Sequence, residues 1–514
     1  MRRLWILSLA LLCACSGGGG GPDAGPPDGR GPDIGLPDPP DSSALDACDA
    51  PARADVSQPD QVVGDGTPDS CTEAALRQAA EAGGIIVFDC GPDPLTLTLN
   101  ETLVIRREAI LDGGGKITLS GGGRVRILLF DSAYDLTTPR LTVQGLTFRD
   151  GRSPAVGDDT AVGGGAIYRD GGSLTVIDSL FIDNQAPFPA QDVAGGAIYA
   201  FGGGETVIVN SSFQGNVASN GGAIGSLNGD LFVLHADFVE NRAAGFGGNP
   251  GQGGCGGAIY QDGADEHTQL CGVRIRNNHA GAIGGGVFRV SNHDNGTFEM
   301  DLSTVDDNHV GAHGVEGATS NAGGLYLQGL AARIDASTLS RNSAFHGGGL
   351  WISEGTYHLT NVTLTGNEAT GTNGGGIWLG QDAGGRLSHV SIVDNHSTGP
   401  DKIAGALFAI GDSRITLHNT LIADNTARWV PGCNEVHPGS GNLEWPRGAN
   451  CSEAPHVADP QLSALGDFGG PTQTLLPSND SPAIGVGTDC APVDQRGVKR
   501  TEPCTLGAVE VGPQ

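Results

Sequence analysis

Apolar residues recur at fixed positions along residues 164–425, and the pattern can be aligned on nine asparagines. The residue three places before each asparagine is always apolar, and so is the residue eight places before it. Both columns are expected to face a core, yet five residues separate them, whereas side chains along one strand alternate with a period of two. A corner must therefore lie between the two columns. The asparagines are Asn184, Asn216, Asn241, Asn278, Asn308, Asn342, Asn367, Asn395 and Asn425.

The corners are predicted from polar, small and glycine positions. The position six before each asparagine is mostly polar or small, as in Asp178 and Asn210, and is expected at the first corner. The asparagine itself is expected at a second corner, because asparagine tolerates left-handed backbone and bonds neighbouring amides. A glycine pair precedes the next strand. Three short strands per turn predict an all-β fold, a single-stranded right-handed parallel β-helix of about twelve turns whose asparagines stack as a hydrogen-bonded ladder.

The segments that follow the asparagines vary far more in length than the rest of each turn. In a stacked solenoid such insertions line up on one face, which is often the binding face. The longest are residues 185–194, 242–255 and 309–322. Two interpretations stay open: the loops form the functional surface, or loop length drifts where nothing constrains it.

An aromatic row is expected just after these loops, with one residue per turn. Eight of nine aligned positions are aromatic, and successive turns would space them by ~4.8 Å. A row that faces outward would stack on sugar rings or pack a partner, whereas a row that faces inward or lies under the loops would be packing. The candidate ligand-stacking residues are Tyr168, Tyr199, Tyr260, Phe288, Tyr326, Trp351, Trp378 and Phe408.

Composition supports a repeat fold and narrows the partners. Glycine makes up 86 of 514 residues, which suits many tight corners. The formal net charge of −30 argues against a nucleic-acid partner, because phosphate binding needs clustered Lys and Arg. We find no zinc, EF-hand, calcium β-roll or phosphate-loop motif, so no cofactor or metal site is expected. Scattered acidic loops leave weak calcium binding open.

The first residues have the pattern of an export signal. Arg2 and Arg3 precede an apolar run over residues 4–12, which is too short to span a membrane. "LCAC" resembles the bacterial lipobox, and this resemblance implies that residues 1–15 form a lipoprotein signal and that Cys15 carries lipid. Ser16 after the cysteine implies the outer membrane, and we expect exposure at the cell surface. An ordinary cleaved secretory signal is the alternative.

Residues 16–69 are rich in Gly, Pro and Asp and are expected to form a disordered tether. Order is predicted to begin at residue 70, with a capping box formed by Ser70 and Glu73 and a helix that Gly83 ends. Such a helix would cap the open end of a parallel stack.

Three segments resemble those of bacterial surface β-helix proteins of the pectin-lyase-like type. "CTEAALRQA" is loosely similar to their CSLREA-type N-terminal segment. The "GGAI" and "FxxN" elements resemble polymorphic outer-membrane protein repeats. "GGPTQT", "SPAI" and "DQRG" look like a choice-of-anchor Q module, although "LGAVE" departs slightly from its usual ending. We therefore assign residues 70–430 to the β-helix and residues 431–514 to the C-terminal module.

Cysteine usage suits an oxidising compartment. Removing Cys13 with the signal and Cys15 to lipid leaves nine of eleven cysteines. Sequence cannot fix connectivity, but neighbours in the chain suggest four pairs and leave Cys48 over. The pairs are Cys71 with Cys90, Cys255 with Cys271, Cys433 with Cys451, and Cys490 with Cys504.

The predicted fold hosts both binding proteins and polysaccharide enzymes, and fold alone does not choose between them. Candidate acids near histidines include Asp306 and Asp307 beside His309, and Asp158 and Asp159 in a Gly-rich loop. Asp307 occupies a column shared with Asp183, Glu240, Asp394 and Asp424, which is better explained by turn chemistry than by one active site. We therefore expect a non-catalytic adhesion or polysaccharide-binding scaffold. A polysaccharide lyase or glycoside hydrolase is the alternative.

Overall fold

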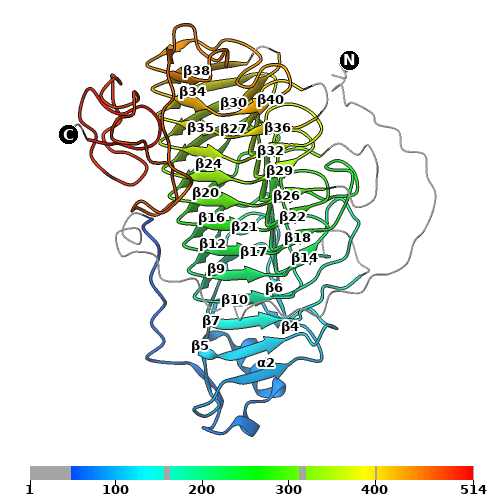
Figure 1. The fold of residues 1–514 in the computed structure, drawn as a ribbon. Coiled ribbons are helices and arrows are strands. Elements are labelled where there is room, and N and C mark those ends of the chain that lie inside the picture. Colours follow the sequence, from blue (N-terminus) through cyan, green and yellow to red (C-terminus); the bar gives the residue numbers. More distant parts are fainter. Residues whose placement is uncertain (1–47, 156–161, 312–319, 400–401, 412, 513–514) are drawn as a thin grey trace, which may run out of the picture.

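The protein is a parallel β-helix with a C-terminal segment packed on one flank (Figure 1). The computed structural model describes residues 48–155, 162–311, 320–399, 402–411 and 413–512. Every pair of adjacent strands in the ladders of the stack is parallel, and each strand pairs with the equivalent strand one turn earlier or later. This confirms the fold predicted from the two apolar columns.

Each turn contributes strands to three faces of the stack and, in its middle turns, one short strand beside the loops. The strands of the first face are β4 (Leu103–Ile105), β6 (Leu128–Asp131), β8 (Ile167–Asp170), β11 (Ile198–Phe201), β15 (Ile224–Leu227), β19 (Ile259–Gly263), β23 (Val287–Ser291), β33 (Ile377–Leu379), β37 (Leu407–Ala409) and the starts of β27 (Leu325–Asp335) and β30 (Leu350–Thr360). The second face holds β1 (Gln61–Gly64), β2 (Gly84–Asp89), β9 (Ser173–Ile177), β12 (Thr206–Val209), β16 (Leu231–Leu234), β20 (His267–Cys271), β24 (Gly296–Asp301), the ends of β27 and β30, β34 (Ala383–Ser388), β38 (Arg414–His418), β41 (Gly439–Ser440) and the starts of β5 (Ala109–Ser120) and β7 (Arg140–Arg149).

The third face follows the same order along the chain. It holds β3 (Leu95–Thr98), the ends of β5 and β7, β10 (Leu180–Ile182), β13 (Ser212–Gln214), β17 (Asp237–Val239), β21 (Arg274–Arg276), β25 (Thr304–Asp306), β28 (Thr338–Ser340), β31 (Thr363–Thr365), β35 (Ser391–Val393), β39 (Leu421–Ala423), β42 (Leu443–Trp445) and β43 (His456–Val457). The short strands are β14 (Val217–Ala218), β18 (Arg242–Ala243), β22 (His279–Ala280), β26 (His309–Val310), β29 (Ser343–Ala344), β32 (Glu368–Ala369), β36 (His396–Ser397) and β40 (Thr426–Ala427).

Both predicted apolar columns face the interior. The column three before the asparagine contains Phe181, Phe213 and Phe238, each fully buried, and their rings stack at centroid distances of 4.6 and 4.8 Å. The column eight before it, from Val176 to Leu417, is equally buried. The odd spacing is resolved as predicted, because a corner separates the second face from the third.

Left-handed residues form the corners. The position six before the asparagine has positive φ in every turn, from Asp178 at 48° to Asn419 at 48°. The second corner differs from the prediction, because the left-handed residue is the one before the asparagine, such as Asp183 at 55° or Asp307 at 54°. This explains the shared acidic column by backbone conformation, since Asp and Asn are the non-glycine residues that adopt it most easily.

The asparagines themselves lie inside and form the expected ladder. Asn216 is fully buried, and its Oδ1 accepts hydrogen bonds from the backbone N–H and the side-chain amide of Asn184, both at 3.0 Å. The same pair of bonds joins each asparagine to the next as far as Asn425. The ladder therefore satisfies backbone N–H groups that the corner leaves without strand partners.

The N-terminal part of the folded body is longer than predicted. Residues 48–60 run along the flank of the stack as a strap, drawn in blue at the left of Figure 1, and lead into β1, which pairs with β2. The strap is held by an ion pair between Arg53 and Asp178 and by two hydrogen bonds between Ala54 and Gln144. The tether predicted over residues 16–69 thus overlaps the fold, and its remainder lies outside the described residues.

The predicted capping helix is α2, Glu73–Ala82, which packs against β1 and β4 at one end of the stack. Its N-cap is Thr72, whose side chain accepts from the backbone N–H of Ala75, and its C-cap is Gly83 at φ 73°. Ser70 instead ends a short 3-10 helix, η1 (Pro68–Ser70). The predicted capping box between Ser70 and Glu73 is therefore wrong, because Thr72 is the N-cap and Glu73 is the first residue of the helix, where its carboxylate bonds to Arg77 and Asn100.

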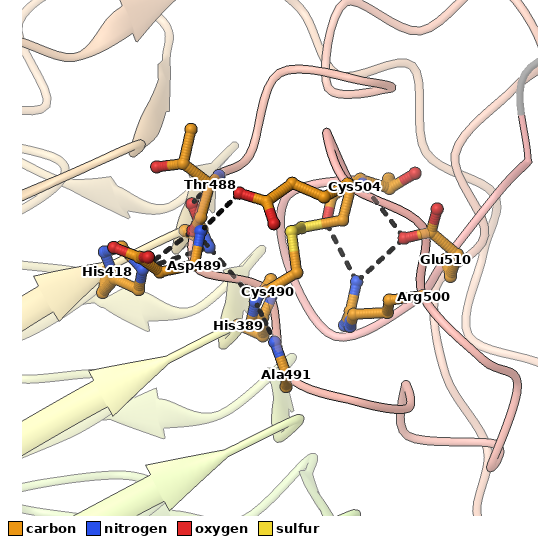
Figure 2. The surroundings of a disulfide bond; sticks show 12 residues. His389, His418, Thr488, Asp489, Cys490, Ala491, Arg500, Cys504 and Glu510 are labelled. Carbon is orange, nitrogen blue, oxygen red and sulfur yellow. Dashed lines mark hydrogen bonds and ion pairs between the residues drawn. A yellow bond between two sulfur atoms is a disulfide. The ribbon is translucent and has the colours of Figure 1, made fainter.

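The C-terminal segment, residues 458–512, lies against the second and third faces. Gln495 is fully buried there, and its amide donates to the hydroxyls of Thr338 and Thr472, both at 2.8 Å. Figure 2 shows the neighbouring contact, in which Nε2 of His389 accepts from the backbone N–H of Ala491 at 3.2 Å. The parallel stack also runs past residue 430, because β41, β42 and β43 continue it.

Four disulfides are formed among the described cysteines. Three pairs agree with the proximity prediction: Cys71–Cys90, Cys433–Cys451 and Cys490–Cys504. The predicted Cys255–Cys271 pair is wrong. Cys271 ends β20 on the strap side and bonds to Cys48, whereas Cys255 precedes the first face, packs against Tyr199 and Tyr260, and is a buried free thiol.

Candidate functional site

The long loops after the asparagines gather on one side of the stack, at the right of Figure 1 and across the stack from the strap. Four large aromatic side chains are exposed on these loops, each three to five residues after a ladder asparagine. They are Phe188 (51% exposed), Phe246 (47%), Phe345 (36%) and Trp429 (65%). Exposed aromatic rings on one face are typical of binding surfaces.

The predicted aromatic row lies under this loop face and is mostly packed. Tyr199 is 1% exposed, and its hydroxyl donates to the backbone oxygen of Asp192 in the covering loop at 3.1 Å. Burial raises the pKa of Tyr199 well above its usual range. The hydroxyl of Tyr260 lies 3.0 Å from Oδ2 of Asp262 and accepts from the Asn249 amide. These hydrogen bonds hold the covering loops against the stack.

The later members of the row stack on one another. Centroid distances are 5.3 Å between Phe288 and Tyr326, 5.9 Å between Tyr326 and Trp351, and 4.6 Å between Trp351 and Trp378. Because each ring covers the face of the next, only ring edges remain toward solvent in this part of the row. The geometry therefore favours packing over the stacking of ligand rings, and Phe408 closes the row in a tilted contact with Trp378.

A charged cluster on the outer side of the second face is the main candidate for acid–base chemistry. The Arg333 guanidinium bonds to both carboxylate oxygens of Asp301, at 2.6 and 3.1 Å, and to Asp335 at 2.8 Å. Burial, partly offset by Arg333, raises the pKa of Asp335 to about 6. Sequence reasoning missed this cluster, because its members come from β24 and β27, whose register is visible only in the fold.

The acids singled out near histidines form links between turns. Asp307 pairs with Nε2 of His309 at 3.1 Å, and Nδ1 of His309 lies 2.8 Å from the Ser343 hydroxyl one turn later. The same arrangement recurs further along the stack, where His396 lies between Asp394 and Thr426. Asp306 instead pairs with Arg341. A repeated arrangement at one corner is consistent with turn chemistry. Asp158 and Asp159 lie outside the described residues.

One group of side chains in the described part of the chain has the spacing of a metal site. It comprises His389, Cys490 and Cys504, but the two sulfurs form a disulfide (Figure 2). Disulfide sulfurs are not the thiolate ligands that bind zinc, so these residues do not fit a metal ion in this state. Burial, reinforced by Arg500 and His418, lowers the pKa of His389 to about 3.

The comparisons with known proteins add one structural likeness. No protein-family model matches the sequence, and no curated protein matches it either. Among solved structures, the crystal structure of pectate lyase Pel9A aligns with 88% of this chain and 97% of its own, at 12% identity and a TM-score of 0.38.

None of the described helices is long and apolar enough to cross a membrane. Cys15, which the sequence predicts to carry lipid, lies outside the described residues.

Proposed function

We propose that this protein is an exported, outer-membrane-anchored surface lipoprotein whose β-helix presents a non-catalytic face for adhesion or polysaccharide binding. The lipobox-like sequence at Cys15 supports the anchor, and four disulfides suit an oxidising compartment outside the cytoplasm. The likeness of the repeats to polymorphic outer-membrane proteins, and of the C-terminal segment to choice-of-anchor Q modules, fits the same role.

The observation that carries the proposal is the line of exposed rings on the loop face. Phe246 and Phe345 are three turns apart, and Phe345 and Trp429 are again three turns apart, which is ~14 Å at one strand spacing per turn. An extended polymer that lies along the solenoid axis would meet these rings in succession. These rings are exposed, whereas those of the row beneath stack on one another. Arg428 lies over one face of Trp429, and His346 contacts Phe345 edge-to-face.

A glycan array with the full chain, beside a polymer degradation screen, tests this function. We expect binding of an extended glycan without turnover. The triple variant Phe246→Ala, Phe345→Ala and Trp429→Ala should weaken binding at least about tenfold, since aromatic contacts contribute about 0.5–1.5 kcal/mol each. Leu136→Ala is the matched control, because Leu136 is 47% exposed but lies between the first and second faces. Equal binding by the triple variant, or turnover of any polymer, would overturn the proposal.

A polysaccharide lyase or hydrolase is the second candidate, and the Asp301–Arg333–Asp335 cluster is what favours it. A carboxyl with a pKa near 6 suits general acid catalysis near neutral pH. An acid–base role is disfavoured because Arg333 already forms ion pairs with the carboxylates of Asp301 and Asp335. If this candidate is right, the degradation screen should find a polymer whose turnover Asp335→Asn abolishes.

A further inference from the structure

A groove of about 520 Å³ opens where the C-terminal segment meets the third face. Its apolar lining comes from Leu462, Leu465 and Leu475 of the C-terminal segment and from Val393 of β35, beside polar residues such as Ser463 and Thr365. Leu475 and Val393 are buried, whereas Leu462 and Leu465 are half-buried. The groove therefore offers an aliphatic surface, with no aromatic ring among its lining residues.

Carboxylates dominate the charge at the rim. Asp394 and Asp424 occupy the same corner position in consecutive turns and both line the groove. Burial, with Asp459 and Asp394 nearby, raises the pKa of Asp424, so these like charges repel one another. The rim cation Arg341 is already paired with Asp306, and His396 lies 3.5 Å from Asp394. Asp424 forms no ion pair with any described residue.

We infer that this groove binds a lysine side chain of an extended peptide in a protein partner. The four-carbon stem would lie along the leucine wall, and the ammonium group would sit between Asp394 and Asp424. Lysine combines an aliphatic stem with a compact charge, which matches this pairing of surfaces. A bound ammonium would also relieve the repulsion between the two carboxylates. None of the four exposed rings of the loop face lines this groove, and the inference does not depend on the function proposed for them.

Acetyl-Ala-Lys-Ala-amide, titrated into the full chain by calorimetry at about 0.15 M salt, tests the inference, because such salt screens long-range attraction by the acidic surface. The norleucine analogue keeps the stem and removes the charge, so it should not bind. The 2,3-diaminopropionate analogue keeps the charge and shortens the stem, so it should bind more weakly than the lysine peptide. Equal binding of the lysine and diaminopropionate peptides would overturn the role of the leucine wall.

Two matched pairs of variants distinguish lysine binding in the groove from general attraction by the acidic surface. Asp394→Asn with Asp424→Asn should weaken lysine-peptide binding roughly tenfold, or about 1.4 kcal/mol. Asp183→Asn with Asp307→Asn removes the same charge at the same left-handed corner, away from the groove, and should change it less than about twofold. Asparagine suits the φ of 54–56° at all four positions. Equal losses in both pairs, or no lysine binding at all, would overturn the inference, whereas the loop-ring variants should leave it unchanged.

Discussion

The side-chain oxygen of Asn278 accepts two hydrogen bonds from Asn241, one from its backbone N–H and one from its amide, both at 2.9 Å. The Asn278 amide in turn donates to Asn308 and to the backbone oxygens of Phe238 and Arg276. The three asparagines and Phe238 are fully buried, and Arg276 is exposed. Each ladder asparagine therefore satisfies polar groups in two neighbouring turns, and its removal would leave those groups without hydrogen-bond partners.

Asn278→Ala is expected to destabilise the fold by about 3–5 kcal/mol, because it leaves several buried donors and acceptors unpaired at about 1–3 kcal/mol each. Chemical denaturation of the full chain measures this loss. Asn277→Ala is the control, because Asn277 is exposed and its loss costs only the strain of alanine at φ 54°, about 1–2 kcal/mol. Similar losses for the two variants would show that the ladder contributes little.

The Cys48–Cys271 disulfide joins residues 223 positions apart and fixes the strap to the middle of the stack. Replacing both cysteines by serine should lower stability by about 2–5 kcal/mol, because the cross-link restricts a long loop in the unfolded chain. Limited proteolysis should then cut the strap near residues 48–60 before the stack. Cys255→Ser, which removes a thiol without a disulfide, should leave the strap protected. A strap that resists protease without its disulfide would contradict this role.

The repeat was predictable from sequence because its signals are local and repeated nine times. Apolar columns such as Phe181, Phe213 and Phe238 report the core directly, and an odd spacing between two such columns demands a corner. The strap was not predictable in the same way. Nothing near Cys48 indicates that its partner is Cys271, because proximity in sequence is a poor guide once a chain runs back along a solenoid.

A second hydrogen-bonded row was also missed. Ser303 and Ser337 lie at the first corner, where the Oγ of Ser303 accepts from the backbone N–H of Val273 and that of Ser337 from Ser303. Its sequence signal is weak, because valine and alanine occupy the same column in other turns.

The candidate site was also hard to predict from sequence. Exposure decides which aromatic residues are free: Phe246 is exposed on a loop, whereas Tyr199 lies on β11 and is covered by a loop.

Acid should loosen the C-terminal segment from the flank through His389. Its pKa is about 3 in the fold, against an ordinary value of about 6.5, because burial disfavours the charged ring and Arg500, His418 and Arg386 lie nearby. The unfolded chain therefore binds more protons than the fold between these values. The contribution of neutral His389 is fully present above pH 6.5 and is lost as the pH falls toward 3.

Denaturation midpoints at pH 7 and pH 5 measure this effect. The wild-type protein should lose more stability over this interval than His389→Gln, whose side chain does not titrate. The comparison between variants is needed because Asp335, with its raised pKa of about 6, acts in the opposite direction and gains stability as the pH falls. Equal pH dependence in the two proteins would refute the assignment to His389.

The glycine pair that precedes the strands of the first face has a specific effect on the stability of the fold. Its first residue is left-handed in each turn, as at Gly195 with φ 67°, and a Cβ there would lie 1.9 Å from the backbone oxygen of Ile198. Gly195→Ala should therefore destabilise the fold by roughly 2–3 kcal/mol through strain and the clash.

The same column holds alanine at Ala404, with φ 62°. Ala404→Gly should relieve about 1–2 kcal/mol of strain, offset by about 0.5–1 kcal/mol of added chain entropy. Denaturation should thus show a marked loss for the first variant and no loss, or a small gain, for the second. A loss in both would mean that chain entropy, and not the left-handed backbone, decides which residue the column tolerates.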